Sequence, residues 1–339
     1  MQKKRRYSRK TGLILLLFMV VLCSVIFFAI RNLKSQMKDM QSQIDLLQKW
    51  TGAGRTDDPG DRTQNPDQPQ SGENTGDESI YASTIPAMQV DKPVKRTREE
   101  AIQYLKGWAA DNTVIKEICE KSVRYPERLL VALANNPEMA DFVAGYPNRK
   151  TGKVGELTQE ECEESFPLLL QWDPRWGYEE YGKESIIGLS GCGPACMSMM
   201  LFYLTGDKEL TPDVIAKYSE ENGYYVEGNG TAWSLMEEMP GRYGIRVSKP
   251  KVLKTDMQSV LDQGGVIICA MGKGNFTAAG HFIVIYGYDR EGFFINDPNC
   301  VSRSRKKWTY DEIARQIKAI WGYTKGSGSI LSMGVRAKK

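Results

Sequence analysis

Cys192 and His281 are the two residues of this chain whose side chains and neighbours suit nucleophilic catalysis. Cys192 lies in the sequence Gly191-Cys192-Gly193-Pro194, where the glycines allow a sharp turn and the proline suits the first turn of a helix. A thiol at a helix N-terminus lies in a partial positive charge that favours the thiolate, the attacking species in cysteine catalysis. A structural cysteine in a tight loop is the alternative.

His281 is the only histidine among the 339 residues, so a general base of the imidazole type has one place in the chain. It opens the apolar run 282–286, which predicts a strand rigid enough to hold the ring, and Gly280 leaves a path to it. An imidazole beside a thiolate can carry the proton in both halves of an acyl transfer. A structural histidine at the start of a strand is the alternative.

Asp297 and Gln171 are candidates for supporting roles. Asp297 follows a predicted strand over 293–296, and a three-residue turn ending at Gly292 would place it on the same sheet face as His281. An even-numbered turn would place the two residues on opposite faces. Even the favourable turn leaves them offset along the strands, so a bulge or a strong twist is needed. A turn-forming Asp-Pro pair is the alternative for Asp297.

Gln171 precedes Cys192 by 21 residues in the sequence. Its side-chain amide could donate to a developing oxyanion together with the backbone N–H of Cys192. An ordinary loop glutamine beside two packing tryptophans is the alternative.

The elements that must position these residues are predicted as helices first and mostly antiparallel strands later, which is an α+β layout. Thr97 and Thr309 each open a capping box, and the second helix is expected to run to about residue 321. Thr231 is expected to cap another helix. Further helices are predicted over 113–121, 126–135, 137–144 and 194–204 and from 211. Strands are predicted over 244–247, 266–271, 282–288, 293–296 and 330–335.

The N-terminal part predicts a membrane anchor and a tether. Residues 1–11 form a basic tail with six positive charges, and 12–30 contain an apolar run of 18 residues, long enough to span a bilayer. The charges predict a cytoplasmic N-terminus and an extracytoplasmic remainder. A cleaved signal peptide is the alternative, but the run lacks a small-residue cleavage site. Residues 31–50 predict a short amphipathic helix whose seam over 33–47 could support a weak homodimer.

Residues 51–79 are rich in Gly, Pro, Asp and Ser and predict a disordered linker. The globular remainder divides into a helical lead-in over 80–160 and a catalytic domain over 161–339.

Composition excludes several function classes. The net charge of +3 becomes −3 once the six charges of the basic tail are removed, so no nucleic-acid-binding face is expected. The sequence contains no phosphate-binding loop and no dinucleotide fingerprint, and a single histidine leaves no His/Cys zinc set. We therefore expect no cofactor and no metal. A disulfide through Cys192 would disable it, so the catalytic interpretation requires a free thiol there.

Five short motifs follow one another along the chain. They are Gln171-Trp172-Asp173-Pro174-Arg175-Trp176-Gly177, Tyr181-Gly182, Gly191-Cys192-Gly193-Pro194, Gly280-His281 and Asn296-Asp297-Pro298. This ordered set resembles the peptidase C39-like family of papain-like cysteine peptidases. Upstream, Tyr125-Pro126-Glu127, Asn136-Pro137-Glu138 and residues 142–147 are similar to the helical lead-in of bacterial members. The resemblance covers about residues 120–325.

The resemblance implies a papain-like fold, a helical part plus an antiparallel sheet. It also implies a triad of Cys192, His281 and Asp297, with Gln171 as the oxyanion donor. Unlike the bacteriocin-processing members, this chain carries no fused transporter or ATPase, so cleavage of double-glycine leaders during export is not implied. Those members also act on the cytoplasmic side.

The leading hypothesis is a membrane-tethered extracytoplasmic cysteine peptidase, or a related thiol acyl hydrolase. Its substrate would be a peptide, a protein or a peptidoglycan-like amide at the cell surface. A papain-like transglutaminase or cell-wall amidase is a second hypothesis, because these enzymes use the same nucleophile and base. The third is a catalytically inactive binding module on a stalk.

Overall fold

The computed structural model describes residues 84–86, 88–152 and 154–326. These residues lie in one compact unit, Ser71–Lys339. The predicted basic tail, membrane span, amphipathic helix, linker and final strand over 330–335 all lie outside the described residues. None of the helices in the described ranges is both long enough and apolar enough to cross a membrane.

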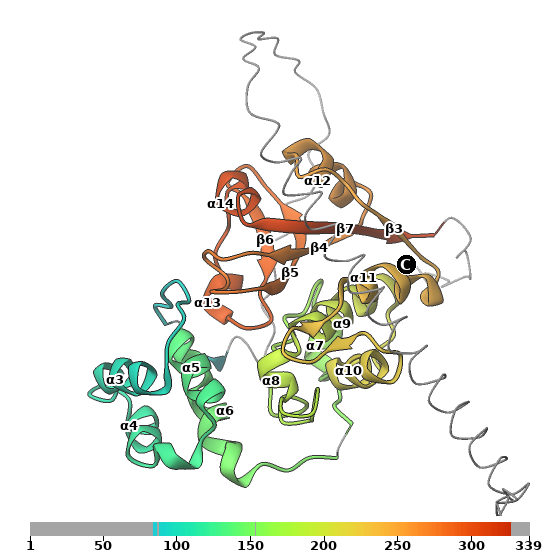
Figure 1. Ribbon diagram of the computed structural model, residues 1–339. Helices are drawn as coiled ribbons and strands as arrows, with labels where there is room; N and C mark the ends of the chain where they lie inside the picture. Colours follow the sequence, from blue (N-terminus) through green and yellow to red (C-terminus); the bar gives the residue numbers. More distant parts are fainter. Residues whose placement is uncertain (1–83, 87, 153, 327–339) are drawn as a thin grey trace, which may run out of the picture. The chain divides into compact units, whose positions relative to one another are not determined.

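The described chain begins with a helical lead-in (Figure 1). Its first helix, α3, starts at the predicted capping box, in which Thr97 and Glu100 exchange side-chain and backbone hydrogen bonds. Leu105 and Leu129 are fully buried between the helices of the lead-in. The elements are α3 (Arg98–Trp108), α4 (Thr113–Glu120), η1 (Ser122–Arg124), α5 (Glu127–Asn135), η2 (Pro137–Met139), α6 (Ala140–Gly145) and η3 (Tyr146–Asn148).

A second group of helices surrounds α9 (Cys192–Thr205), the helix that carries the candidate nucleophile. Eleven of its residues are buried, which agrees with a sequence that is apolar nearly all round, and it ends at Gly206 in the left-handed conformation with φ 74°. Its companions are α7 (Gln159–Glu163), α8 (Ile187–Ser190), α10 (Pro212–Glu221), α11 (Trp233–Glu238) and η4 (Pro240–Tyr243). A small hairpin of β1 (Tyr225–Val226) and β2 (Gly230–Thr231) lies beside them.

The main sheet has five strands in the order β3-β7-β4-β5-β6, and every neighbouring pair is antiparallel. The strands are β3 (Ile245–Ser248), β4 (Val266–Met271), β5 (His281–Tyr288), β6 (Phe293–Asn296) and β7 (Ile317–Lys325). Three helices accompany them: α12 (Lys254–Asp262), α13 (Val301–Ser304) and α14 (Tyr310–Ala314). The α+β prediction is confirmed, and the β4, β5 and β6 predictions agree with the structure to within one residue.

Both faces of this sheet are covered, which explains its continuous apolar strands (Figure 1). Val284 and its alternating neighbours join the core around α9, whereas Ile283 and Ile285 join a separate core with α12 and α14. The sheet is therefore a rigid middle layer, and its strand ends can hold side chains at fixed positions.

Two sequence predictions are wrong. The helix expected from Thr309 to about residue 321 starts at its predicted capping box but ends at Ala314, and β7 takes up the remainder. The reason is tertiary, because β7 pairs with both β3 and β4 in the middle of the sheet, where aromatic and β-branched residues pack well. Thr231 belongs to β2, and α11 has Ala232 at its N-cap with no side-chain cap.

Candidate active site

Cys192 is the first residue of α9, and the glycines on either side of it are required by close packing. A Cβ atom on Gly191 would lie 2.6 Å from the carbonyl oxygen of Ile187, and one on Gly193 would lie 2.5 Å from Oγ1 of Thr231. Both distances are shorter than any side chain tolerates, so only glycine lets the backbone turn here. The turn leaves Cys192 half-buried at the N-terminal end of a 14-residue helix.

His281 is the first residue of β5 and interacts with two candidate residues at once. Its Nε2 atom lies 2.6 Å from Oδ1 of Asp297, and the side chain of Cys192 also interacts with the ring and acts to raise its pKa. The imidazole thus lies between the thiol and the carboxylate.

A β-bulge makes the contact between His281 and Asp297 possible. The turn between β5 and β6 has four residues, since Tyr288 pairs with Phe293, and alone it would place the two side chains on opposite faces. The register shifts between Ile285 and Gly287, so β5 has one extra residue there. This extra residue returns the two side chains to the same face of the sheet. The expected three-residue turn is therefore not observed, and the bulge has the same effect.

The electrostatics of the pair favour a charged imidazole and a charged carboxylate. Burial alone would lower the pKa of His281, but the charge and hydrogen bond of Asp297 and the contact with Cys192 raise it to about 10. Burial likewise acts to raise the pKa of Asp297. The charge and hydrogen bond of His281, with Arg303 and the N–H of Asn299, lower it overall. With the His281 side chain 8% exposed and that of Asp297 fully buried, the pair is shielded from water.

Arg303 on α13 is a further member of the site, which sequence reasoning missed. Its Nη1 atom lies 3.1 Å from Oδ2 of Asp297, and it is 5% exposed. Nη2 of Arg303 is buried and has no hydrogen-bond partner among the described residues. The carboxylate of Asp297 is therefore held from two sides, by His281 on one oxygen and Arg303 on the other. A lone arginine six residues after Asp297 gives no sequence signal of this contact.

Gln171 lies beside both halves of the site. Its backbone N–H donates to the carbonyl of Pro298 at 2.7 Å, and its side-chain Nε2 donates to the carbonyl of Gly188 at 3.0 Å. The first bond ties the backbone of Gln171 to the residue that follows Asp297, and the second ties its amide to Gly188, four residues before Cys192. One N–H of Nε2 is used by Gly188, and within the described residues the other makes no recorded bond. That second N–H is the group that an oxyanion would need.

The six cysteines in the described residues are free thiols. They are Cys119, Cys162, Cys192, Cys196, Cys269 and Cys300. Burial raises the pKa of Cys196 well above its ordinary value, and those of Cys269 and Cys300 also rise through burial. These buried thiols are packing residues, whereas Cys192 is half-buried beside an imidazole.

A groove of about 490 Å³ lies next to the segment that leads into Cys192. Its walls come from the lead-in, including Arg128 and Arg149, and from the catalytic domain, including Lys183 and Leu189. Arg128 also donates from Nη2 to Oγ of Ser190 at 3.1 Å, two residues before Cys192. Neither Cys192 nor His281 lines the groove, which reaches as far along this segment as Leu189.

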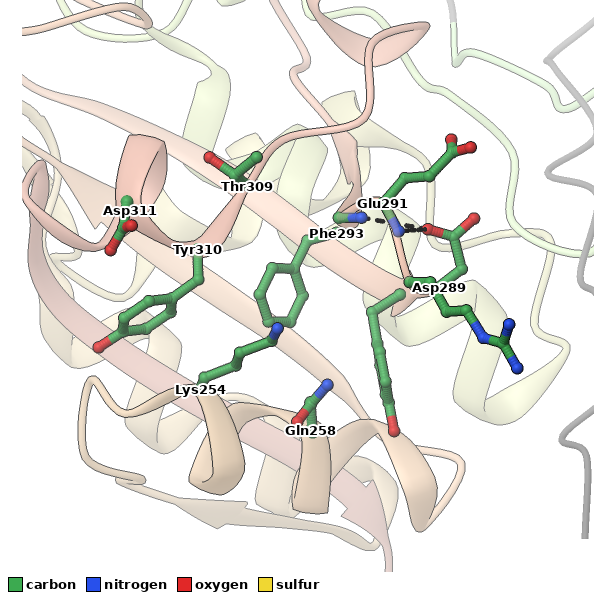
Figure 2. Close-up of a pocket in the computed structure, with 11 residues that line it drawn as sticks. Lys254, Gln258, Asp289, Glu291, Phe293, Thr309, Tyr310 and Asp311 are labelled. Atoms are coloured by element: carbon green, nitrogen blue, oxygen red, sulfur yellow. Dashed lines mark hydrogen bonds between the residues drawn. The ribbon is translucent and has the colours of Figure 1, made fainter. Parts of the chain in front are cut away.

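A second cavity of about 300 Å³ lies at the other end of the β5–β6 hairpin (Figure 2). Figure 2 shows Phe293 and Tyr310 beside Lys254, with Asp289 and Glu291 on the turn above them. Its lining contains no cysteine and no histidine. Because the hairpin turn and the open strand ends are opposite ends of the same element, this cavity is not part of the candidate active site.

A cysteine that begins a buried helix, beside a histidine and an aspartate from an antiparallel sheet, is the arrangement that defines papain-like cysteine peptidases. Residues 163–329 match the family model described as the Peptidase_C39 like family.

Two solved structures are similar to part of this chain. The peptidase domain of ComA from Streptococcus, a bi-functional ABC transporter involved in quorum sensing, matches with 18% identity and a TM-score of 0.32, over 40% of this chain and 92% of that chain. A C39-like peptidase from Bacillus anthracis matches with 16% identity and a TM-score of 0.29, over 40% of this chain and 89% of that chain. No curated protein matches the chain.

Proposed function

We propose that this protein is a cysteine peptidase, or a closely related thiol acyl hydrolase, that cleaves peptide or amide bonds. The observation that carries the proposal is the position of His281, whose ring contacts the carboxylate of Asp297 and the thiol of Cys192. A nucleophile beside a base that is itself oriented by a third group is the arrangement required for covalent acyl transfer.

In the first half of the reaction, Cys192 attacks the substrate carbonyl carbon as a thiolate while His281 holds the proton that the thiol has lost. The carbonyl oxygen becomes an oxyanion, to which the backbone N–H of Cys192 and the amide of Gln171 donate. When the intermediate collapses, His281 transfers its proton to the departing amine, and a thioester remains on Cys192.

In the second half, a water molecule replaces the amine. His281 takes a proton from this water as its oxygen attacks the thioester carbonyl, and the carboxylic acid leaves as Cys192 recovers its proton. Asp297 stays ionised throughout, because its role is to orient the ring and to stabilise the imidazolium.

The proposed cellular context depends on the N-terminal sequence. The apolar run within 12–30 and the basic residues before it support a single-pass anchor with a cytoplasmic N-terminus. The substrate would then be a peptide, protein or peptidoglycan-like amide outside the cytoplasm. Cleavage of the extracytoplasmic part by a protease added to intact cells tests this topology, and full protection would contradict it.

Labelling with a thiol-directed electrophile tests the proposed chemistry. Cys192 should react at neutral pH well ahead of a free thiol, and mass spectrometry of the labelled peptide identifies the site. A rate equal to that of free cysteine would exclude an activated nucleophile. Product analysis then separates the alternatives, because a transferase gives a transamidated product where a peptidase gives a hydrolysed one.

A further inference from the structure

Glu138 is a buried carboxylate that comes from the lead-in and reaches the catalytic domain. It lies on η2, outside the residues 163–329 that match the family, and it is 7% exposed. Oε2 accepts the backbone N–H of Val301 at 2.7 Å, and Oε1 accepts that of Ser302 at 2.9 Å and also its hydroxyl. Val301 and Ser302 are the first two residues of α13, so Glu138 caps this short helix.

The helix that Glu138 caps carries the arginine that holds Asp297. Arg303 follows Ser302 directly, and its guanidinium interacts electrostatically with both Asp297 and Glu138. The direct ion pair with Asp297 and the more distant charge of Glu138 both favour the charged guanidinium. A charge interaction therefore links Glu138 to Arg303, and direct contacts link Arg303 to Asp297 and Asp297 to His281.

Asn136 adds a second contact between the lead-in and the same loop. Its side-chain Nδ2 donates to the carbonyl of Asn299, and its Oδ1 accepts the N–H of Glu138. The backbone N–H of Asn299 in turn donates to Oδ1 of Asp297 at 2.8 Å. The lead-in thus holds the segment that follows Asp297 at two points, Asn299 and the start of α13.

We propose that Glu138 is a positioning residue of the Cys192–His281–Asp297 site, and that the lead-in is a working part of this site rather than a spacer. The inference rests on the proposed function, because it concerns the same site. It goes further, since it assigns a role to a segment that the family match does not cover.

The single histidine provides a direct measurement of this role. Nuclear magnetic resonance of the full-length chain, labelled at histidine and purified without a histidine tag, shows the titration of His281 alone. The wild-type ring should titrate near pH 10. In Glu138→Gln the negative charge is lost and the loop is held less firmly, so the midpoint should fall by about one unit, the scale of one charged hydrogen bond.

The matched control is Asp141→Asn, which removes an exposed carboxylate from α6 in the same lead-in. It should leave the midpoint unchanged. Ser302→Ala removes one donor to Glu138 and keeps the carboxylate, so it should shift the midpoint in the same direction by less. This second variant keeps the test decisive if Glu138→Gln does not fold.

The two possible failures are distinguishable. If wild-type His281 titrates near its ordinary value and Cys192 alkylates like a free thiol, the proposed function fails. If the wild type behaves as expected but folded Glu138→Gln and Ser302→Ala both titrate like it, only the positioning role of Glu138 is overturned. The pH profile of Cys192 alkylation should shift with the ring, which a purely structural role would not cause.

Discussion

The Nε2 atom of His281 lies 2.6 Å from Oδ1 of Asp297, and both side chains are almost completely buried. At this distance, a protonated ring and an ionised carboxylate form a charge-assisted hydrogen bond. The ring therefore stays positively charged well above neutral pH, and that charge is what a neighbouring thiolate needs.

Replacement of Cys192 by alanine should abolish hydrolysis. Within the part of the chain that the structure describes, Cys192 is the thiol that interacts with His281, and Cys196 is fully buried one turn deeper in α9. Activity should fall by more than about 10³-fold, the order of loss expected when a nucleophile is removed. Peptide hydrolysis by purified protein measures it, with Cys196→Ala as the matched thiol control. Equal activity of Cys192→Ala and the wild type would exclude covalent catalysis at this residue.

The stability contributed by His281 should depend on pH in a defined direction. Its pKa rises from 6.5 to about 10 in the folded state, so folding favours the protonated ring. This contribution is complete below about pH 6.5 and disappears as the pH rises to about 10. Urea unfolding of the wild type and His281→Gln should give a difference in unfolding free energy that shrinks across this range. A difference that stays constant from pH 6 to 10 would contradict the charged pair.

Asp297→Asn should separate two effects of Asp297 on His281, the orientation of the ring and the charge beside it. The amide oxygen of asparagine can still accept the hydrogen bond from His281 but carries no charge, so the pKa of the ring should fall by at least about two units toward its ordinary value. The same change leaves Arg303 buried without its carboxylate partner. That should cost about 3 kcal/mol of unfolding free energy.

Nuclear magnetic resonance of the single histidine and urea unfolding measure these two effects of Asp297→Asn separately. Asp289→Asn, which changes a partly exposed aspartate at the other end of the hairpin, is the matched control and should alter neither the His281 titration nor Arg303. If Asp297→Asn keeps the wild-type titration midpoint, the carboxylate is not what raises the pKa of the ring.

The four candidate residues could be found from sequence because each has a local signal. Cys192 lies between glycines before a helix, His281 opens an apolar strand, and Asp297 ends the next strand. Their contacts could not be derived from the sequence. Whether His281 and Asp297 lie on the same face of the sheet depends on a bulge at residue 286, and no residue type there predicts a bulge. Arg303 and Glu138 could not be identified from the sequence either. Glu138 bonds to a residue 163 positions further along the chain, and Arg303 lies on a short helix that has no recognisable motif.

The sheet shows the same limit. Apolar runs between turn residues predict strands β4 to β6, whereas the residues that begin β7 predict the end of a helix. The residues of β7 suit either structure locally, and pairing with β3 and β4 decides between them. Pairing with strands that are distant in the sequence therefore decides between helix and strand where local propensity does not.

Gly193→Ala should destabilise the fold. A Cβ atom at this position would lie 2.5 Å from Oγ1 of Thr231, which is held by Tyr181, so β2 or α9 must shift. Overpacking of this kind costs about 1–3 kcal/mol. Gly107→Ala in α3 is the matched control, because no atom lies within 4 Å of its new Cβ and the helix should gain about 0.5 kcal/mol. Thermal unfolding should show opposite shifts for the two variants, and shifts of the same sign would contradict the close contact.

Gln171→Ala should impair turnover without impairing the nucleophile. Its amide contacts Gly188 and lies beside Pro298, whereas the activation of Cys192 comes from His281. Loss of one oxyanion donor typically lowers kcat by about 10²–10³-fold. Alkylation of Cys192 by iodoacetamide forms no oxyanion, so its rate should stay close to that of the wild type. His281→Gln should slow both reactions and serves as the comparison. If Gln171→Ala slowed alkylation as much as hydrolysis, its role would be to support the loop that carries Cys192, and the oxyanion assignment would be wrong.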